Sequence, residues 1–185
     1  MTAAMKAVVV FESMFGNTEQ IAREIAGGLA AGGARVALAD VRHTRPEDLR
    51  GCDLLVVGAP THALSLSRAG TRQEAVRLGA PRSRAVLGVR EWLATLDGAL
   101  GPAPDRPAVA VFDSRLRKVE HWPGSAARRA ARILRSQDLE VLEPVSSFYV
   151  DDLRGPLARG ERERARAWGD HLAEQAAART RTAAS

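Results

Sequence analysis

Short apolar runs alternate with stretches of helical periodicity along this 185-residue chain. Apolar runs of this length between turn residues are typical of buried strands. They predict strands over residues 7–11, 36–40, 53–58 and 108–112, and a last one over residues 140–150 that bends at Pro144. A β-α-β-α order is the signature of a parallel sheet with helices on both faces. We therefore expect an α/β protein with three layers.

Apolar residues three and four positions apart predict the helices between these strands. In residues 18–31 the apolar face carries Ile21, Ile25 and Leu29. Thr44-Arg45-Pro46-Glu47 has the form of a capping box with proline in the first turn, and predicts a short helix. Further helices are expected over residues 71–78, 88–96, 125–135 and 160 to about 178, and a frayed tail over residues 179–185.

Length and composition favour a single domain over residues 1–185, with a core from about residue 6 to residue 175. The chain is 45% hydrophobic and shows no repeat and no linker. It has no run near the roughly 18 apolar residues of a membrane helix, and its first residues lack the pattern of a signal peptide. We expect a cytoplasmic protein without membrane contact.

The net charge of +5 would suggest nucleic acid as a partner. However, only Lys6 and Lys118 are lysines among the 27 basic residues, a bias typical of a GC-rich genome. The arginines are spread over predicted helices without interleaved aromatic residues, so we expect no specific nucleic acid. Cys52 is the only cysteine, which excludes an internal disulfide and cysteine-based metal sites. We interpret it as a small, inert residue.

The polar loop between the first predicted strand and the first predicted helix is the most informative segment. It reads Ser13-Met14-Phe15-Gly16-Asn17-Thr18. A phosphate at a helix start needs backbone N–H groups, the helix dipole and small polar side chains. Ser13 and Thr18 supply hydroxyls, Asn17 supplies an amide, and Gly16 lets the backbone turn close to a ligand. The loop contains no lysine or arginine, which distinguishes it from a Walker loop. It predicts a phosphate site built from neutral groups.

A purely structural role for this loop is the alternative. Asn17 would cap the helix, because Asn17-x-x-Gln20 fits a capping box. Capping accounts for these two residues but not for Ser13, Gly16 and Thr18 directly after a buried strand. We therefore favour phosphate binding.

Residues 11–18, Phe11-Glu12-Ser13-Met14-Phe15-Gly16-Asn17-Thr18, resemble the phosphate loop of the flavodoxin family. That loop has a hydroxyl residue, any residue, threonine or an aromatic, glycine, any residue and threonine. The order of predicted elements is also similar over most of the chain. The resemblance implies a flavodoxin-like fold with a five-stranded parallel sheet and FMN as the cofactor. The flavin ring would lie between the loops after the third and fourth strands.

The resemblance places the ring site in two segments. The family often has tryptophan or another stacking residue at the position of His62, which either contacts the flavin or is a solvated loop residue. Trp122 either covers the ring or packs under the helix that follows it. The segment after the third strand contributes Pro60, Thr61, His62 and Ala63. The segment after the fourth strand contributes Asp113, Ser114, Arg115 and Trp122.

Three functions remain open. The favoured one is an FMN-binding electron carrier that works with a redox partner protein or a small-molecule acceptor. The second is an FMN-dependent NAD(P)H oxidoreductase with a quinone or similar acceptor, favoured by the long stretch over residues 61–106; such enzymes are often oligomers, so a homodimer is possible. The third is a flavodoxin-like binding module without flavin. No Ser-His-Asp set or carboxylate pair indicates other catalysis, and Trp92 and Trp168 are expected in the core.

Overall fold

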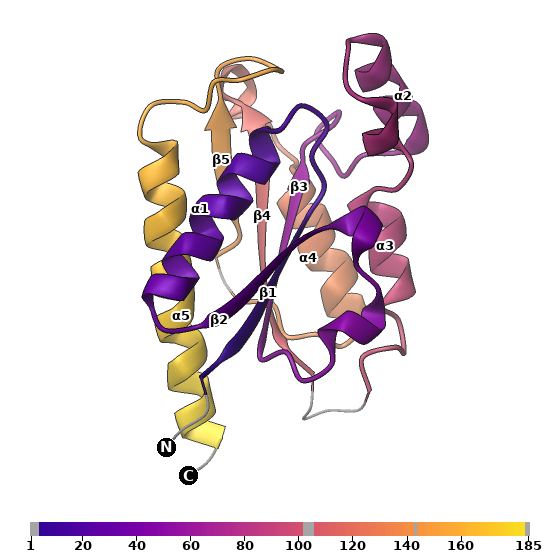
Figure 1. Ribbon diagram of the computed structural model, residues 1–185. Coiled ribbons are helices and arrows are strands. Elements are labelled where there is room, and N and C mark those ends of the chain that lie inside the picture. The colour runs from indigo at the N-terminus through magenta and orange to yellow at the C-terminus, as the bar shows by residue number, and fades with distance from the viewer. Residues whose placement is uncertain (1–3, 102–105, 143, 184–185) are drawn as a thin grey trace.

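The computed structural model describes residues 4–101, 106–142 and 144–183, and it contains one sheet whose neighbouring strands are all parallel (Figure 1). Helices cover both faces of the sheet, so the predicted three-layer α/β fold with five strands is confirmed. The carboxyl ends of the five parallel strands lie along the same edge of the sheet, and the loops that follow the strands gather there. The sheet order is β2-β1-β3-β4-β5, with β1 (Lys6–Phe11), β2 (Arg35–Asp40), β3 (Leu54–Pro60), β4 (Ala108–Leu116) and β5 (Ser146–Val150).

Helices α1 (Asn17–Ala31) and α5 (Glu161–Ala183) lie side by side on one face of the sheet (Figure 1). Two glycines bring them into backbone contact. A Cβ on Gly28 would lie 2.0 Å from the carbonyl oxygen of Arg166, and a Cβ on Gly169 would lie 2.2 Å from that of Ile25. Any larger residue at either position would force the helices apart. None of the helices in the described ranges is long and apolar enough to cross a membrane.

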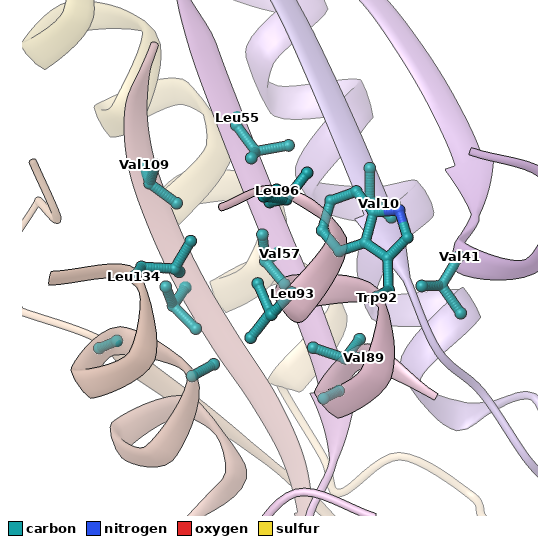
Figure 2. Packing of buried hydrophobic residues seen from close by; sticks show 14 of the residues in the cluster. Val10, Val41, Leu55, Val57, Val89, Trp92, Leu93, Leu96, Val109 and Leu134 are labelled. Carbon is teal, nitrogen blue, oxygen red and sulfur yellow. The ribbon is translucent and has the colours of Figure 1, made fainter. Parts of the chain in front are cut away.

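The opposite face is covered by α3 (Val89–Thr95), α4 (Ala126–Ser136) and the 3-10 turns η1 (Val41–His43) and η2 (Pro46–Leu49). Trp92 is 1% exposed, and its indole N–H donates to the carbonyl oxygen of Thr44 at 2.8 Å. Figure 2 shows the indole packed beside Val10 and Val41. The expected core position of Trp92 is confirmed, while Trp168 is only half-buried and contacts Phe112 on the other face.

The long segment between β3 and β4 packs against the loop after β1. It contains α2 (Ala69–Arg77) and η3 (Arg82–Ala85) before α3. Ala75, Ala80 and Ala85 from this segment form a small apolar cluster with Met14, which is 2% exposed. The predicted phosphate loop is thus held on one side by a segment more than 50 residues away along the chain.

Two strands differ from their predictions. The fourth strand continues past residue 112 to Leu116, because its pairing with β3 extends to Ser114 opposite Pro60 and its pairing with β5 to Leu116 opposite Val150. The last strand begins at Ser146 rather than at residue 140. Pro144 precedes it and lacks the N–H that a ladder requires. Val141 forms only an isolated bridge, with Val109.

Helix boundaries also differ in two places. The expected capping box at Thr44 is wrong: the carboxylate of Asp48 accepts from the backbone N–H of Arg45 at 2.7 Å, and the Thr44 hydroxyl donates to the carbonyl oxygen of Asp40. The tail predicted to fray continues α5 as far as Ala183, and residues 184–185 lie outside the described residues.

Candidate functional site

A pocket lies at the carboxyl edge of the sheet, where the loops after β1, β3, β4 and β5 meet. It contains about 450 Å³ of empty space, part of it open to solvent. Three residues outside the sequence prediction, Leu116, Val150 and Leu153, also line it. The predicted site residues that line it are Ser13, Met14, Phe15, Asn17, Thr18, Pro60, Thr61, His62, Ser114 and Arg115.

Ser13 organises the start of α1. Gly16 precedes the helix with φ of +94°, a left-handed conformation that glycine adopts without strain. The Ser13 hydroxyl oxygen accepts from the backbone N–H of Gly16 at 3.1 Å and of Glu19 at 3.3 Å. Both lone pairs of this oxygen are used, so its own hydrogen remains to donate, and it has no acceptor among the described residues.

Asn17 ties the phosphate loop to the loop after β5. It is the first residue of α1, and its amide nitrogen donates to the carbonyl oxygen of Leu153 at 2.8 Å. The capping alternative is therefore wrong, because the residue before the helix is Gly16 and no side-chain cap is formed there. The Asn17 side-chain oxygen is buried and has no partner within the described part of the chain.

Thr18 and Ser114 connect α1 with β4. Their hydroxyl oxygens are 2.7 Å apart and buried, and either one can be the donor. One hydrogen is used between them, so the other hydroxyl hydrogen is left over. Both residues line the pocket, and the remaining O–H is therefore available there.

Further donors in this region have no acceptor among the described residues. The backbone N–H groups of Phe15, Asn17 and Thr18 make no hydrogen bond to another described residue, as is usual for the first turn of a helix. Arg115 is 6% exposed, and its Nε–H is buried without a partner among the described residues. The pocket is thus rich in unused donors, a composition that suits an anion.

Arg84 brings a positive charge to the phosphate loop. It lies in η3, and its guanidinium donates to the carbonyl oxygen of Ser13 at 3.2 Å and to the carboxylate of Glu19 at 3.0 Å. The sequence prediction of a site built from neutral groups missed this contact. No local signal announces it, because Arg84 is 71 residues away from Ser13 and reaches it only through the fold.

The loop after β3 makes a tight turn beside the pocket. The backbone groups of His62 and Ser65 exchange two hydrogen bonds of 2.9 and 3.0 Å. Between them, Ala63 and Leu64 have φ of 46° and 62°. Both are non-glycine residues in the left-handed region, where backbone strain is expected and where functional sites often store it. Ala63 does not line the pocket; its neighbour His62 does.

His62 presents a neutral imidazole. Burial lowers its pKa to about 4, with a further contribution from the positive charge of Arg72. The alternative of a solvated loop histidine is wrong, because the side chain is partly buried and lines the pocket. At neutral pH the ring therefore offers one N–H donor and one nitrogen acceptor.

Asp113 and Thr61 hold the first turn of α4 through hydrogen bonds. Asp113 is completely buried, and its carboxylate accepts from the Thr61 hydroxyl at 2.9 Å and from the backbone N–H of Ala127 at 3.0 Å. The Thr61 oxygen accepts in turn from the N–H of Ala126 at 2.9 Å. Asp113 does not line the pocket.

Arg115 holds the loop after β4. Its guanidinium donates to the carbonyl oxygens of Val119 and Trp122. The Trp122 side chain is 58% exposed, so the expectation that it packs under α4 is wrong; it does not line the pocket either. The loops after β3 and β4 touch at Gly124, where a Cβ would lie 2.7 Å from the carbonyl oxygen of Leu64.

Other chemistry finds no support in the described residues. Cys52 is buried, and burial raises the pKa of its thiol to about 11, so it remains protonated and unreactive at neutral pH. Within residues 4–101, 106–142 and 144–183, no group of three or more histidine, cysteine, aspartate or glutamate side chains is placed to hold a metal ion.

Comparisons with known proteins agree with this fold. Residues 9–73, which span β1, the phosphate loop and β3, match the flavodoxin family model, described as "Flavodoxin". No curated protein matches the chain. Among solved structures, a flavodoxin from the domain Archaea superposes with a TM-score of 0.68 and 20% identity, covering 93% of this chain and 99% of that one.

Two other solved structures show the same fold. A two-electron reduced flavodoxin from Megasphaera elsdenii has a TM-score of 0.60 and 19% identity over 91% of this chain and 98% of its own. The rubredoxin oxygen:oxidoreductase of Desulfovibrio gigas has a TM-score of 0.64 and 19% identity, covering 94% of this chain but only 36% of that larger protein. Residues 9–73 match the flavodoxin family model, and the described residues share the flavodoxin fold.

Proposed function

We propose that this protein binds FMN and carries electrons between redox partners. The observation that carries the proposal is a set of donors at the pocket that have no acceptor in the described part of the chain: the Ser13 hydroxyl, the remaining hydroxyl of the Thr18–Ser114 pair, the Arg115 Nε–H and the N–H groups at the start of α1. Burying donors without hydrogen-bond partners costs free energy. A phosphate group that accepts hydrogen bonds from these donors would remove that cost.

The residues present fit the two ends of FMN. Donors at Ser13 and Thr18 suit its terminal phosphate, and the dipole of α1 adds to them. The flat side chains of Phe15 and His62 line the same pocket and suit an aromatic ring. Bound FMN would supply a ring that takes up and releases one or two electrons, while the protein sets its potential through nearby charge.

A second candidate is an FMN-dependent NAD(P)H oxidoreductase. The packing of α2 and η3 on Met14 favours it, because this segment adds a wall next to the phosphate loop. An enzyme must exclude water and hold a second substrate, and such a wall serves both purposes. Oxidation of NADPH or NADH by the protein, with a quinone as acceptor, separates this activity from simple electron carriage.

Flavin titration tests the proposal directly. The purified protein is expected to show flavin absorbance, and the flavin-free protein to bind FMN at least tenfold more tightly than riboflavin, which lacks the phosphate. The variant Thr18→Val removes a hydroxyl from the phosphate loop, and Thr95→Val is its matched control. Thr95 is exposed at the end of α3, far along the chain from the loop. Equal affinities for FMN and riboflavin would show that the loop does not hold the phosphate. No binding of either flavin would support a binding module without flavin.

A further inference from the structure

Five arginines lie on three neighbouring segments: one on the loop after β3, one on α3 and three on α4. We call Arg68, Arg90, Arg128, Arg129 and Arg132 the arginine patch. Burial, together with the positive charges of Arg68 and Arg129, lowers the pKa of Arg90, whereas Glu91 and Glu12 act in the opposite direction. Arg128 and Arg132 line, with Ala131, Arg135 and Val145, a surface hollow with about 690 Å³ of empty space that is partly open solvent. Figure 1 shows α3 and α4 next to each other.

Helix α4 adds positive charge to the patch without a carboxylate on the same helix. Helix α4 reads AARRAARILRS and contains no acidic residue. None of the five arginines forms an ion pair within the described part of the chain, whereas arginines elsewhere do, such as Arg23 with Glu19 and Arg42 with Asp40. The high arginine content alone therefore does not explain the patch.

Gathering these charges has a cost for the isolated protein. Arg128 and Arg132 are four residues apart on one helix, and like charges at that spacing destabilise it. Arg90 donates to neutral oxygens, the carbonyls of Leu66 and Ser67 and the Ser65 hydroxyl, and forms no ion pair within the described residues. Its charge is only partly offset, by the nearby carboxylates of Glu91 and Glu12. An acidic surface placed against the patch would supply the missing negative charge.

The patch borders the loops that flank the pocket. Arg90 holds Ser65, which closes the turn at Ala63 and Leu64. The first turn of α4, with Arg128 and Arg129, follows the residues whose N–H groups bond to Thr61 and Asp113. A protein bound to the patch would therefore lie beside the loops after β3 and β4, which flank the pocket.

We propose that the arginine patch is the docking surface for an acidic electron-transfer protein, an inference that rests on the proposed function. A protein fits better than nucleic acid, because no aromatic side chain stands among the five arginines to stack on bases. It also fits better than a membrane. The large apolar side chains that are exposed, Leu78, Val86, Trp122 and Leu153, lie outside α3 and α4, so these helices have none to insert.

Binding of a plant-type [2Fe–2S] ferredoxin, a small acidic redox protein, tests the proposal. Its Kd for the protein is measured by calorimetry at low and physiological salt, with the flavin content of each sample recorded by absorbance. We expect binding that weakens as salt rises, and a loss of about tenfold or more in the double variant Arg128→Glu/Arg132→Glu. The double variant Arg35→Glu/Arg50→Glu carries the same change of charge at the start of β2 and at the end of η2, and is expected to bind within twofold of the parent.

Three results would overturn the proposal. These are no ferredoxin binding at low salt, equal losses in both double variants, and tighter binding of a 20-base-pair DNA duplex or of phosphatidylserine vesicles through Arg128 and Arg132. Circular dichroism checks that the variants fold. A protein that takes up no FMN on titration but still binds ferredoxin through the patch would contradict the proposed function and leave the patch intact, so the two failures are distinguishable.

Discussion

The hydroxyl oxygens of Thr18 and Ser114 lie 2.7 Å apart, although 96 residues separate them along the chain. This contact joins the first turn of α1 to the carboxyl-terminal part of β4, the strand beside the central strand β3. It leaves a single hydroxyl hydrogen for a ligand, because the pair uses the other one internally. The two side chains therefore act as one donor.

This sharing predicts non-additive effects on FMN affinity. Thr18→Val or Ser114→Ala alone leaves one hydroxyl whose hydrogen is free for the phosphate, so each is expected to weaken FMN by about threefold or less. The double variant removes the donor and is expected to lose about tenfold or more, roughly 1–2 kcal/mol. Fluorescence titration of the four proteins measures the cycle.

Riboflavin serves as the control for this cycle. Because it lacks the phosphate, its affinity is expected to stay within twofold in all four proteins. A tenfold loss in each single variant would show two independent donors, and a matching loss of riboflavin would show that the pair acts through the fold instead.

The second prediction concerns substitutions of Gly16, whose effect on stability depends on backbone strain rather than on the space for a side chain. Its φ is +94°, yet a Cβ at this position would meet nothing within 4 Å. Gly16→Asn is expected to be tolerated better than Gly16→Val, because asparagine visits the left-handed region and β-branched residues avoid it. The valine variant is expected to lose about 1–2 kcal/mol of unfolding free energy, measured in urea without flavin. Equal stabilities of the two variants would contradict the role of backbone strain.

The phosphate loop was predictable from sequence because its signals are local. A buried strand, two hydroxyl residues and Gly16 occupy one short stretch, and each has its meaning there. The contacts of this loop with Arg84 and Leu153 span 71 and 136 residues. Such contacts depend on how the loops pack at the edge of the sheet, and no periodicity in the sequence carries that information.

The end of β4 was missed for a related reason. Asp113, Ser114 and Arg115 are polar, and polar residues after an apolar run indicate a loop. In the structure all three are buried in the strand, because Thr61, Thr18 and the carbonyl of Trp122 provide hydrogen-bond partners from distant segments. Hydropathy cannot reveal partners of this kind.

His62 predicts a pH dependence of stability. Its pKa is lowered from 6.5 to about 4 by burial, so the unfolded chain binds a proton on this residue at a pH where the folded protein does not. Well above pH 6.5 the ionisation of His62 contributes nothing to the free energy of unfolding. As the pH falls towards 4 it lowers this free energy increasingly, by about 2.5 kcal/mol at pH 4.5. His62→Gln, which does not titrate, is expected to lose that much less stability between pH 7.0 and 4.5.

Urea unfolding of both proteins at the two pH values measures this difference, since the carboxylates common to both cancel. A parallel decline would show that His62 is accessible to protons in the folded protein, and would remove the argument for a neutral imidazole at the pocket.

The last prediction concerns the redox potential of bound FMN. Arg115 and Arg117 are two positions apart in the sequence but differ in burial and in ion pairing. Arg115 is 6% exposed and lines the pocket. Among the described residues it bonds to carbonyl oxygens and forms no ion pair. Arg117 is 60% exposed and paired with Asp151 at 3.0 Å. A cation about 8 Å from a reduced, anionic flavin stabilises it by ~1 kcal/mol at an effective dielectric near 40, which is roughly 45 mV. Solvent and Asp151 screen Arg117 from any such effect.

Arg115→Gln is therefore expected to lower the potential of the second electron by tens of millivolts, whereas Arg117→Gln, with the same change of charge, is expected to shift it by less than about 10 mV. Arg115→Lys keeps the charge but not the fork that binds Val119 and Trp122, so it separates the effect of charge from that of loop position. Spectroelectrochemistry on the FMN-loaded proteins measures all three. If the lysine variant shifts as far as the glutamine variant, the position of the loop rather than the charge of Arg115 sets the potential.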